Sequence, residues 1–170
     1  SRVGLMDTLL IGIDAGTSVI KAVAFSPDGT QIAVASAPSV ITRLADGGAE
    51  QDPDATWEAV AAALRRLGDD VPDLAGRTAA IGITAHGDGA WLVDDSGRPV
   101  GPGLTWLDSR AGPIVERWRK SEAGPALHAI TGTALNPCLQ SAQLAWLRDH
   151  HPERVARASA VLHPKDWLYL

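Results

Sequence analysis

A short segment between two apolar runs carries residue types suited to binding a polyphosphate. Leu9–Ile13 and Ile20–Phe25 are predicted to be strands. The segment around the turn between them supplies a carboxylate, a glycine, two hydroxyls and an amine, in Asp14, Gly16, Thr17, Ser18 and Lys21. Backbone N–H groups and hydroxyls of such a turn can face phosphate oxygens, and a glycine permits close backbone approach. A carboxylate at the strand end suits Mg²⁺, which prefers oxygen ligands. The alternative is a plain hairpin in which aspartate and glycine serve only the turn geometry.

The strands that must hold this turn belong to a predicted antiparallel meander at the start of the chain. After the second strand, Ser26–Gly29 supplies turn chemistry, with a proline preset for the first corner and a glycine free to take positive φ. Gln31–Val40 is the third predicted strand. Because tight turns join the three strands, we expect consecutive strands to be neighbours in one sheet.

A helix is predicted next, from its start signals and its hydrophobic spacing. Asp52 can cap it, Pro53 suits the first helical position, and Asp54 complements the N-terminal dipole. Apolar side chains then recur at helical spacing in Trp57, Val60, Ala61, Leu64 and Leu67. Gly68 is predicted to end this helix.

The rest of the chain alternates short strands and helices. Strands are predicted at Thr78–Thr84, Ala90–Val93 and Ser159–Leu162, with a short extended piece at 104–106. Helices are predicted at Pro113–Lys120, Ala123–Thr131 and Ser141–Asp149, separated by glycine and Asn-Pro breaks. A last helix begins at Pro164 and reaches Leu170 without a stop signal, so we expect the chain to be incomplete.

Composition excludes several classes of protein. The 170 residues carry a net charge of −5 without a run of basic residues, so a nucleic-acid partner or an anionic membrane partner is not expected. No apolar stretch approaches the length of a membrane span, and no signal-peptide pattern is present. The single cysteine, Cys138, cannot form a disulfide within the chain, which fits the reducing cytoplasm. The histidines other than His86 lack metal-ligand spacing and are interpreted as surface or helix-end residues.

The ordered combination of motifs resembles the FGGY family of carbohydrate kinases. Residues 11–18, Ile-Gly-Ile-Asp-Ala-Gly-Thr-Ser, resemble the family's opening hairpin, which is the first phosphate-binding loop of the actin-like ATPase superfamily. It is not a Walker loop, because the G-x-x-x-x-G-K-[ST] pattern is absent. Further segments resemble the family in the same order: residues 50–57, 81–84, 97–110, 131–147 and 164–168. They include a W-x-D-x-R segment at 106–110 and the sequence P-K-D-W-L at 164–168.

The resemblance implies a fold and a domain organisation. The fold class is α/β, a ribonuclease H-like or actin-like ATPase domain with a mixed sheet and flanking helices, here incomplete. Residues 1–8 are interpreted as a tag or flexible start. Residues 9–170 are then the front part of the N-terminal, sugar-binding domain, and the second domain is absent from this chain.

The resemblance also implies a substrate pocket. Its predicted residues are His86, Gly87, Asp88, Trp106, Asp108 and Arg110. A polyol offers only hydroxyls, so its site needs hydrogen-bond acceptors and donors rather than an apolar slot. The two aspartates can accept, the arginine and histidine can donate, and the tryptophan offers a wall for the C–H face. The alternatives are a structural ion pair for Asp108 and Arg110, a core role for Trp106, and a loop-orienting role for His86. The other five tryptophans are expected in the core.

An ATP- and Mg²⁺-dependent sugar or polyol kinase is therefore the expected function, with Asp14 near the metal and phosphates. Glycerol kinases carry Arg-Glu, and xylulokinases Met-His, at the positions that here are Gly87 and Asp88. This departure favours a short linear polyol such as erythritol. A ketose such as L-xylulose and a non-catalytic sugar-binding or regulatory module are the alternatives. The resemblance implies a catalytic base beyond Leu170, so the chain alone is expected to be inactive. A cytoplasmic location is expected, and a homodimer is left open.

Overall fold

A computed structural model describes residues 7–170, so most of the segment interpreted as a tag or flexible start lies outside the described residues. The described chain forms two compact units, which we treat separately. The first unit comprises residues 7–40, residues 54–86 and Tyr169. The second unit comprises residues 41–53, residues 87–168 and Leu170.

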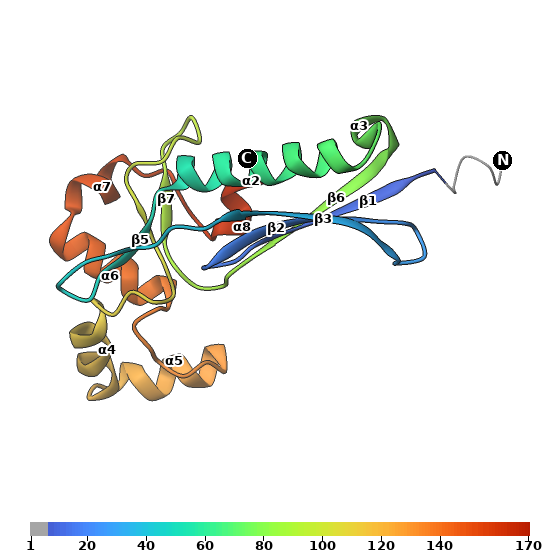
Figure 1. Cartoon of the computed structure of the whole chain (residues 1–170). Coiled ribbons are helices and arrows are strands. Elements are labelled where there is room, and N and C mark those ends of the chain that lie inside the picture. Colours follow the sequence, from blue (N-terminus) through green and yellow to red (C-terminus); the bar gives the residue numbers. More distant parts are fainter. Residues whose placement is uncertain (1–6) are drawn as a thin grey trace. The chain divides into compact units, whose positions relative to one another are not determined.

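The first unit is built on a four-stranded mixed sheet (Figure 1). Its strands are β1 (Leu9–Ala15), β2 (Val19–Phe25), β3 (Gln31–Pro38) and β6 (Thr78–Ala85), in the order β3-β2-β1-β6. The first three pair antiparallel, and β6 runs parallel to β1. The predicted meander is therefore confirmed, with the third strand ending at Pro38 instead of Val40.

Helix α2 (Pro53–Asp70) lies along this sheet, followed by the single turn α3 (Leu74–Arg77) (Figure 1). Alternate strand residues such as Ile11, Ile13 and Ile20 are buried, as are Val60 and Leu67 of the helix. This alternation matches the period of two for strands, with one face packed and the other open. The helix continues for two residues past Gly68, the predicted end. Trp57 was expected in the core but is 50% exposed, whereas Val60, three residues along the same helix, is buried.

The second unit combines two small sheets with five helices. One sheet has the order β4-β5-β8, formed by Thr42–Arg43, Ala49–Gln51 and Gly103–Leu104. The other pairs β7 (Trp91–Val93) with β9 (Ala160–Leu162). The helices are α4 (Gly112–Arg119), α5 (Ala123–Thr131), α6 (Gln140–His150), α7 (Pro152–Arg157) and α8 (Pro164–Trp167). The core of this unit includes Leu92, Leu104, Ile114, Val115, Trp146 and Leu147.

Most predicted elements of the second unit are present, within one or two residues at each end. The prediction for α5 has the observed bounds, whereas the last helix ends at Trp167 rather than reaching Leu170. The strands β4 and β5 and the helix α7 were not predicted. Among residues 7–170, no helix combines the length and apolar content that crossing a membrane requires.

Candidate active site

The turn between β1 and β2 is tight enough to require a glycine. A Cβ added to Gly16 would lie 2.9 Å from the backbone oxygen of Val19, closer than ordinary van der Waals contact allows. The far side of the turn is tied to the end of the meander, because Ser39 N donates to Ser18 O at 3.3 Å. Thr17 is half-buried and Ser18 is exposed, so the Ser18 hydroxyl is the more accessible of the two. The predicted phosphate turn is therefore a tight hairpin that carries one exposed hydroxyl residue, Ser18, and one half-buried one, Thr17.

A row of polar side chains crosses the open face of the first unit's sheet next to this turn. Lys21 is the register partner of Asp14 on β1 and of Ser36 on β3. Asp14 is also the register partner of Thr84 on the parallel strand β6. Register partners in a sheet present their side chains to the same face, and all four residues are exposed. We call Ser36, Lys21, Asp14 and Thr84 the polar row.

The polar row lines a concave surface of about 850 Å³ on the open face of the sheet. Gly12 and Gly82 are register partners that lie two residues before Asp14 and Thr84 on the same strands. Because they have no side chains, the backbone forms this part of the concave surface. Apolar side chains complete the lining, among them Val23, Phe25 and Val34. A surface with a carboxylate, an amine and two hydroxyls on one side and apolar groups on the other suits an amphipathic ligand.

Asp14 is the predicted metal ligand, and the carboxylate, imidazole and thiol groups near it determine which kind of metal site it can form. Within residues 7–170, no group of three or more His, Cys, Asp or Glu side chains is arranged to hold a metal ion. Mg²⁺ usually retains several waters and takes only one or two protein carboxylates together with substrate phosphates. A single exposed carboxylate in the polar row therefore fits a Mg²⁺ that arrives with a polyphosphate, and does not fit a permanently bound metal.

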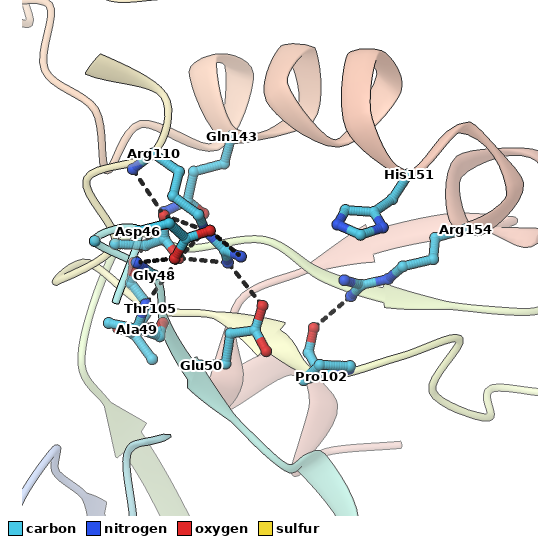
Figure 2. Close-up of polar contacts among 12 residues, drawn as sticks. Asp46, Gly48, Ala49, Glu50, Pro102, Thr105, Arg110, Gln143, His151 and Arg154 are labelled. Atoms are coloured by element: carbon cyan, nitrogen blue, oxygen red, sulfur yellow. Dashed lines mark hydrogen bonds and ion pairs between the residues drawn. The ribbon is translucent and has the colours of Figure 1, made fainter. Parts of the chain in front are cut away.

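In the second unit, Asp108 and Arg110 form a buried ion pair. Arg110 also reaches Glu50 (Figure 2). Arg110 Nη2 lies 2.7 Å from Asp108 Oδ2 and 2.7 Å from Glu50 Oε1. Asp108 Oδ2 also accepts the backbone N–H of Ala49 at 2.9 Å, and Oδ1 accepts the backbone N–H of Arg110 at 3.1 Å. The structural ion-pair alternative is thus present in the structure. Contact of these two residues with a substrate stays a prediction.

The guanidinium of Arg110 is also stacked over an aromatic ring. Its Cζ lies 4.1 Å from the ring centroid of Trp146, within the range of a cation–π contact. Burial disfavours the charged form, but the hydrogen bonds to Asp108 and Glu50 outweigh it, so the pKa of Arg110 is raised. Arg110 therefore stays charged and joins β5, the segment 105–110 and α6.

Arg154 is a second buried guanidinium in this unit, and it has a different setting (Figure 2). It donates through Nη2 to the backbone oxygen of Pro102, while its Nε atom has no hydrogen-bond partner. Burial lowers the pKa of Arg154, with the negative charge of Glu50 acting in the opposite sense. A Cβ on Gly101 would lie 2.5 Å from Arg154 Nε, so this glycine makes room for the guanidinium.

Trp106 projects from the same segment but is 46% exposed. The core alternative for this residue is therefore wrong. Trp106 presents an accessible aromatic ring two residues before Asp108, in the segment that the ion pair holds in place. Gln143 supports the segment from α6, because its Nε2 donates to Thr105 O at 2.8 Å. The expectation that all other tryptophans are core residues holds fully for Trp91 and Trp146, which are both buried.

The remaining predicted pocket residues lie on both sides of the division between the units. His86 belongs to the first unit, where its backbone N–H donates to Ala15 O at 3.3 Å beside the phosphate turn. Gly87 and Asp88 belong to the second unit, whose second stretch of chain starts at Gly87. Asp88 has φ of +52°, a left-handed conformation that is uncommon for residues other than glycine. Its carboxylate accepts a hydrogen bond from the thiol of Cys138 at 3.3 Å.

Comparison with known proteins identifies the family to which the chain belongs. The model of the N-terminal domain of the FGGY family of carbohydrate kinases matches residues 9–170. The chain belongs to the FGGY family. The predicted resemblance is confirmed over the range from which it was argued.

Individual FGGY relatives support the same placement. Erythritol kinase from Brucella abortus (strain 2308) is 48% identical over 162 residues, which are 95% of this chain and 31% of that protein. A probable L-xylulose kinase from Pasteurella multocida (strain Pm70) is 33% identical over 159 residues, which are 93% of this chain and 33% of that protein. The chain thus spans about a third of the length of the curated relatives it matches.

Solved FGGY kinases have the same fold. The crystal structure of a "xyloylose kinase" from Brucella ovis matches with a TM-score of 0.89 and 30% identity, covering 95% of this chain and 34% of that one. A xylulose kinase from Rhodospirillum rubrum matches with a TM-score of 0.88 and 28% identity, covering 95% and 33%. The predicted α/β, actin-like ATPase fold class with a mixed sheet and flanking helices is therefore confirmed.

Proposed function

We propose that the full-length gene product carrying this chain is an ATP-dependent kinase that phosphorylates a small polyol such as erythritol. The observation that carries the proposal is the 48% identity to an erythritol kinase, against 33% to a probable L-xylulose kinase over a similar length. The exposed polar row and the separate Asp88 and Trp106 positions are consistent with it.

The first unit would supply contacts to the phosphates of ATP. Lys21 and the Ser18 hydroxyl are exposed beside the turn, and Gly16 keeps that turn tight. Asp14 would hold Mg²⁺, which neutralises charge on the transferred phosphoryl group when it is bound. Thr17, which is half-buried, is assigned to the same site. Because phosphoryl transfer depends mainly on positioning and charge neutralisation, these contacts match what such a reaction needs.

The second unit would supply contacts to the polyol. His86, in the first unit, stays a predicted polyol contact. Trp106 offers an exposed ring for the C–H face, and Asp88 offers a carboxylate acceptor beside Gly87. Asp108 and Arg110 remain assigned to this pocket, and their buried pairing supports a role in holding the Trp106 segment in place. The proton acceptor for the reacting hydroxyl is not assigned to any residue of this chain.

A substrate panel on the full-length gene product tests this proposal. ATP consumption is measured against erythritol, other tetritols, pentitols, glycerol, D-xylulose and L-xylulose in the presence of Mg²⁺. Selective turnover of erythritol or a close polyol is the expected result. Selective turnover of L-xylulose would replace the polyol by a ketose while keeping the kinase. A folded protein without turnover of any compound would favour the non-catalytic sugar-binding alternative.

A further inference from the structure

The carboxylate of Asp88 has one protein donor among residues 7–170, and that donor is a thiol. Cys138 Sγ lies 3.3 Å from Asp88 Oδ2, although the two residues are 50 positions apart in the sequence. No described side chain donates to the other carboxylate oxygen, Oδ1. An ionised carboxylate has two acceptor oxygens with about four lone-pair sites, so most of its capacity is available to a ligand.

The loop that carries Asp88 is fixed against the segment that carries Cys138 by two further contacts. Gly89 N donates to Cys138 O at 3.3 Å, and Gln140 Nε2 donates to Gly89 O at 3.3 Å. A Cβ on Gly89 would lie 2.5 Å from Leu104 O, so no other residue type fits there without movement. Both ends of the carboxylate–thiol contact are therefore held by backbone.

The thiol faces two acceptors with a single proton. Its Sγ also lies 2.7 Å from Asn136 Oδ1, and that same oxygen accepts the backbone N–H of Cys138 at 3.0 Å. Burial, together with the hydrogen bond to Asp88 and its negative charge, raises the pKa of Cys138 to about 11. At neutral pH the group is thus a protonated donor, not a thiolate nucleophile.

We propose that Cys138 is a positioning residue that fixes Asp88 Oδ2, so that Oδ1 faces outward to accept a hydroxyl of the polyol. This inference rests on the proposed function, since Asp88 is assigned to the polyol pocket there. The thiol acts through Asp88 and needs no contact with the reacting atoms. If Cys138 positions Asp88 in this way, the choice of polyol depends on Cys138, in the segment before α6, as well as on the Gly87-Asp88 loop.

Kinetics of matched variants in the full-length gene product provide the first test. Cys138→Ala removes the donor, and Cys138→Ser keeps one. Because a thiol is a weak donor to a charged acceptor, we expect Cys138→Ala to raise the KM for erythritol about 3- to 10-fold. We expect kcat to change less than about twofold, as for loss of a contact made equally in the ground and transition states. Cys138→Ser should restore most of the loss. Ser141→Ala, which removes an exposed hydroxyl three residues along, should match the parent.

Unchanged KM in Cys138→Ala would overturn the inference, as would equal losses in the alanine and serine variants. Absence of turnover in the parent would instead count against the proposed function, so a second measurement does not depend on turnover.

That measurement is the alkylation rate of Cys138 by iodoacetamide at pH 9, followed on its own peptide by mass spectrometry. Asp88→Asn removes the negative charge that raises the thiol pKa, while Asp69→Asn changes an exposed aspartate of α2. With a Brønsted coefficient of about 0.4–0.5, each unit by which the pKa falls should speed alkylation about threefold. We expect faster alkylation in Asp88→Asn and an unchanged rate in Asp69→Asn. An unchanged rate in Asp88→Asn would contradict the positioning role, whether or not the parent turns over erythritol.

Discussion

Asp14 and Asp108 are the same chemical group in opposite settings, one in each unit. Asp14 is exposed in the polar row on the open face of a sheet, where no ion pair or hydrogen bond from residues 7–170 engages its carboxylate. Asp108 is 2% exposed and takes hydrogen bonds from Ala49 and from both the backbone and the side chain of Arg110. The first carboxylate is available to a ligand, whereas the second is already used to hold its own fold.

The difference between the two aspartates allows effects of substitution on ligand binding to be distinguished from effects on folding stability. A buried, paired charge is costly to disturb because removal of one partner leaves the other charge uncompensated in a low-dielectric interior. An exposed charge without a partner contributes little to folding. Substitutions at the two positions should therefore have effects of different kinds, and the following predictions are ordered by expected size.

The largest effect is expected for Asp108→Ala. It leaves Arg110 with only Glu50 and the distant Asp46 as charged partners, and should lower the free energy of unfolding by about 3–5 kcal/mol. Urea denaturation monitored by fluorescence measures it. The matched control is Asp46→Asn, at the exposed partner 4.0 Å from Arg110 Nη1, with an expected loss of no more than about 1 kcal/mol. Equal losses in the two variants would remove the distinction between the two settings.

Asp14→Asn should show the converse behaviour. We expect its free energy of unfolding to stay within about 0.5 kcal/mol of the parent, as for surface substitutions generally. Its ATP turnover should fall about 100-fold or more, because charge stabilisation at the transferred group is a large catalytic term. Steady-state kinetics at saturating Mg²⁺ and a parallel urea titration check both parts. A variant that unfolds more easily yet turns over normally would assign Asp14 to the fold.

Trp106→Ala tests whether exposure predicts a binding role on the second unit. We expect a KM for the polyol raised about 3- to 10-fold, because the ring would lose its contact with the C–H face of the substrate. The control is Trp57→Ala on α2, a tryptophan of similar exposure in the first unit, for which KM should not change. Identical KM values for the two variants would withdraw Trp106 from the pocket.

The smallest effect is expected for Asp166 in α8, where a half-buried carboxylate pairs with Lys165. The hydrogen bond from Lys165 is the main cause that lowers the pKa of Asp166. A lowered pKa in the folded state stabilises the fold above the unfolded pKa of about 3.9, and the benefit is lost as pH falls through the folded value. With the side chain 36% exposed, Asp166→Asn should cost at most about 1 kcal/mol at pH 7. The gap between variant and parent should close towards pH 3 in thermal melts. A gap that persists at pH 3 would show that the charge is not its source.

Local patterns were sufficient to predict much of the fold. The meander followed from alternating apolar runs and tight turns, and α5 from the breaks on either side of it. The strands β4 and β5 were not predicted because they contain only two and three residues, and β5 pairs with β8 some fifty residues later. Helix α7 is six residues long, too short for a hydrophobic period to be recognised.

The same limit applies to the candidate site. That Lys21 lies opposite Asp14 follows from the hairpin between them. Thr84 joins the polar row only through a parallel register across 70 positions, which no sequence pattern specifies. Glu50 with Arg110, and Cys138 with Asp88, are likewise pairs that only the folded chain brings together. Burial of individual side chains was also beyond the pattern, as Trp57 shows.

The pairing of Glu50 with Arg110 has a consequence for biosynthesis. The second unit uses residues on both sides of the segment 54–86, which builds the first unit. The two partners are 60 residues apart, so at roughly 5–20 residues per second Glu50 emerges from the ribosome about 3–12 s before Arg110. The meander, the long helix and β6 can all assemble during that interval. During that interval β5 can pair with β4 but not with β8, so we expect its second edge to stay open and to be a point of vulnerability to proteolysis or to chaperone binding during synthesis.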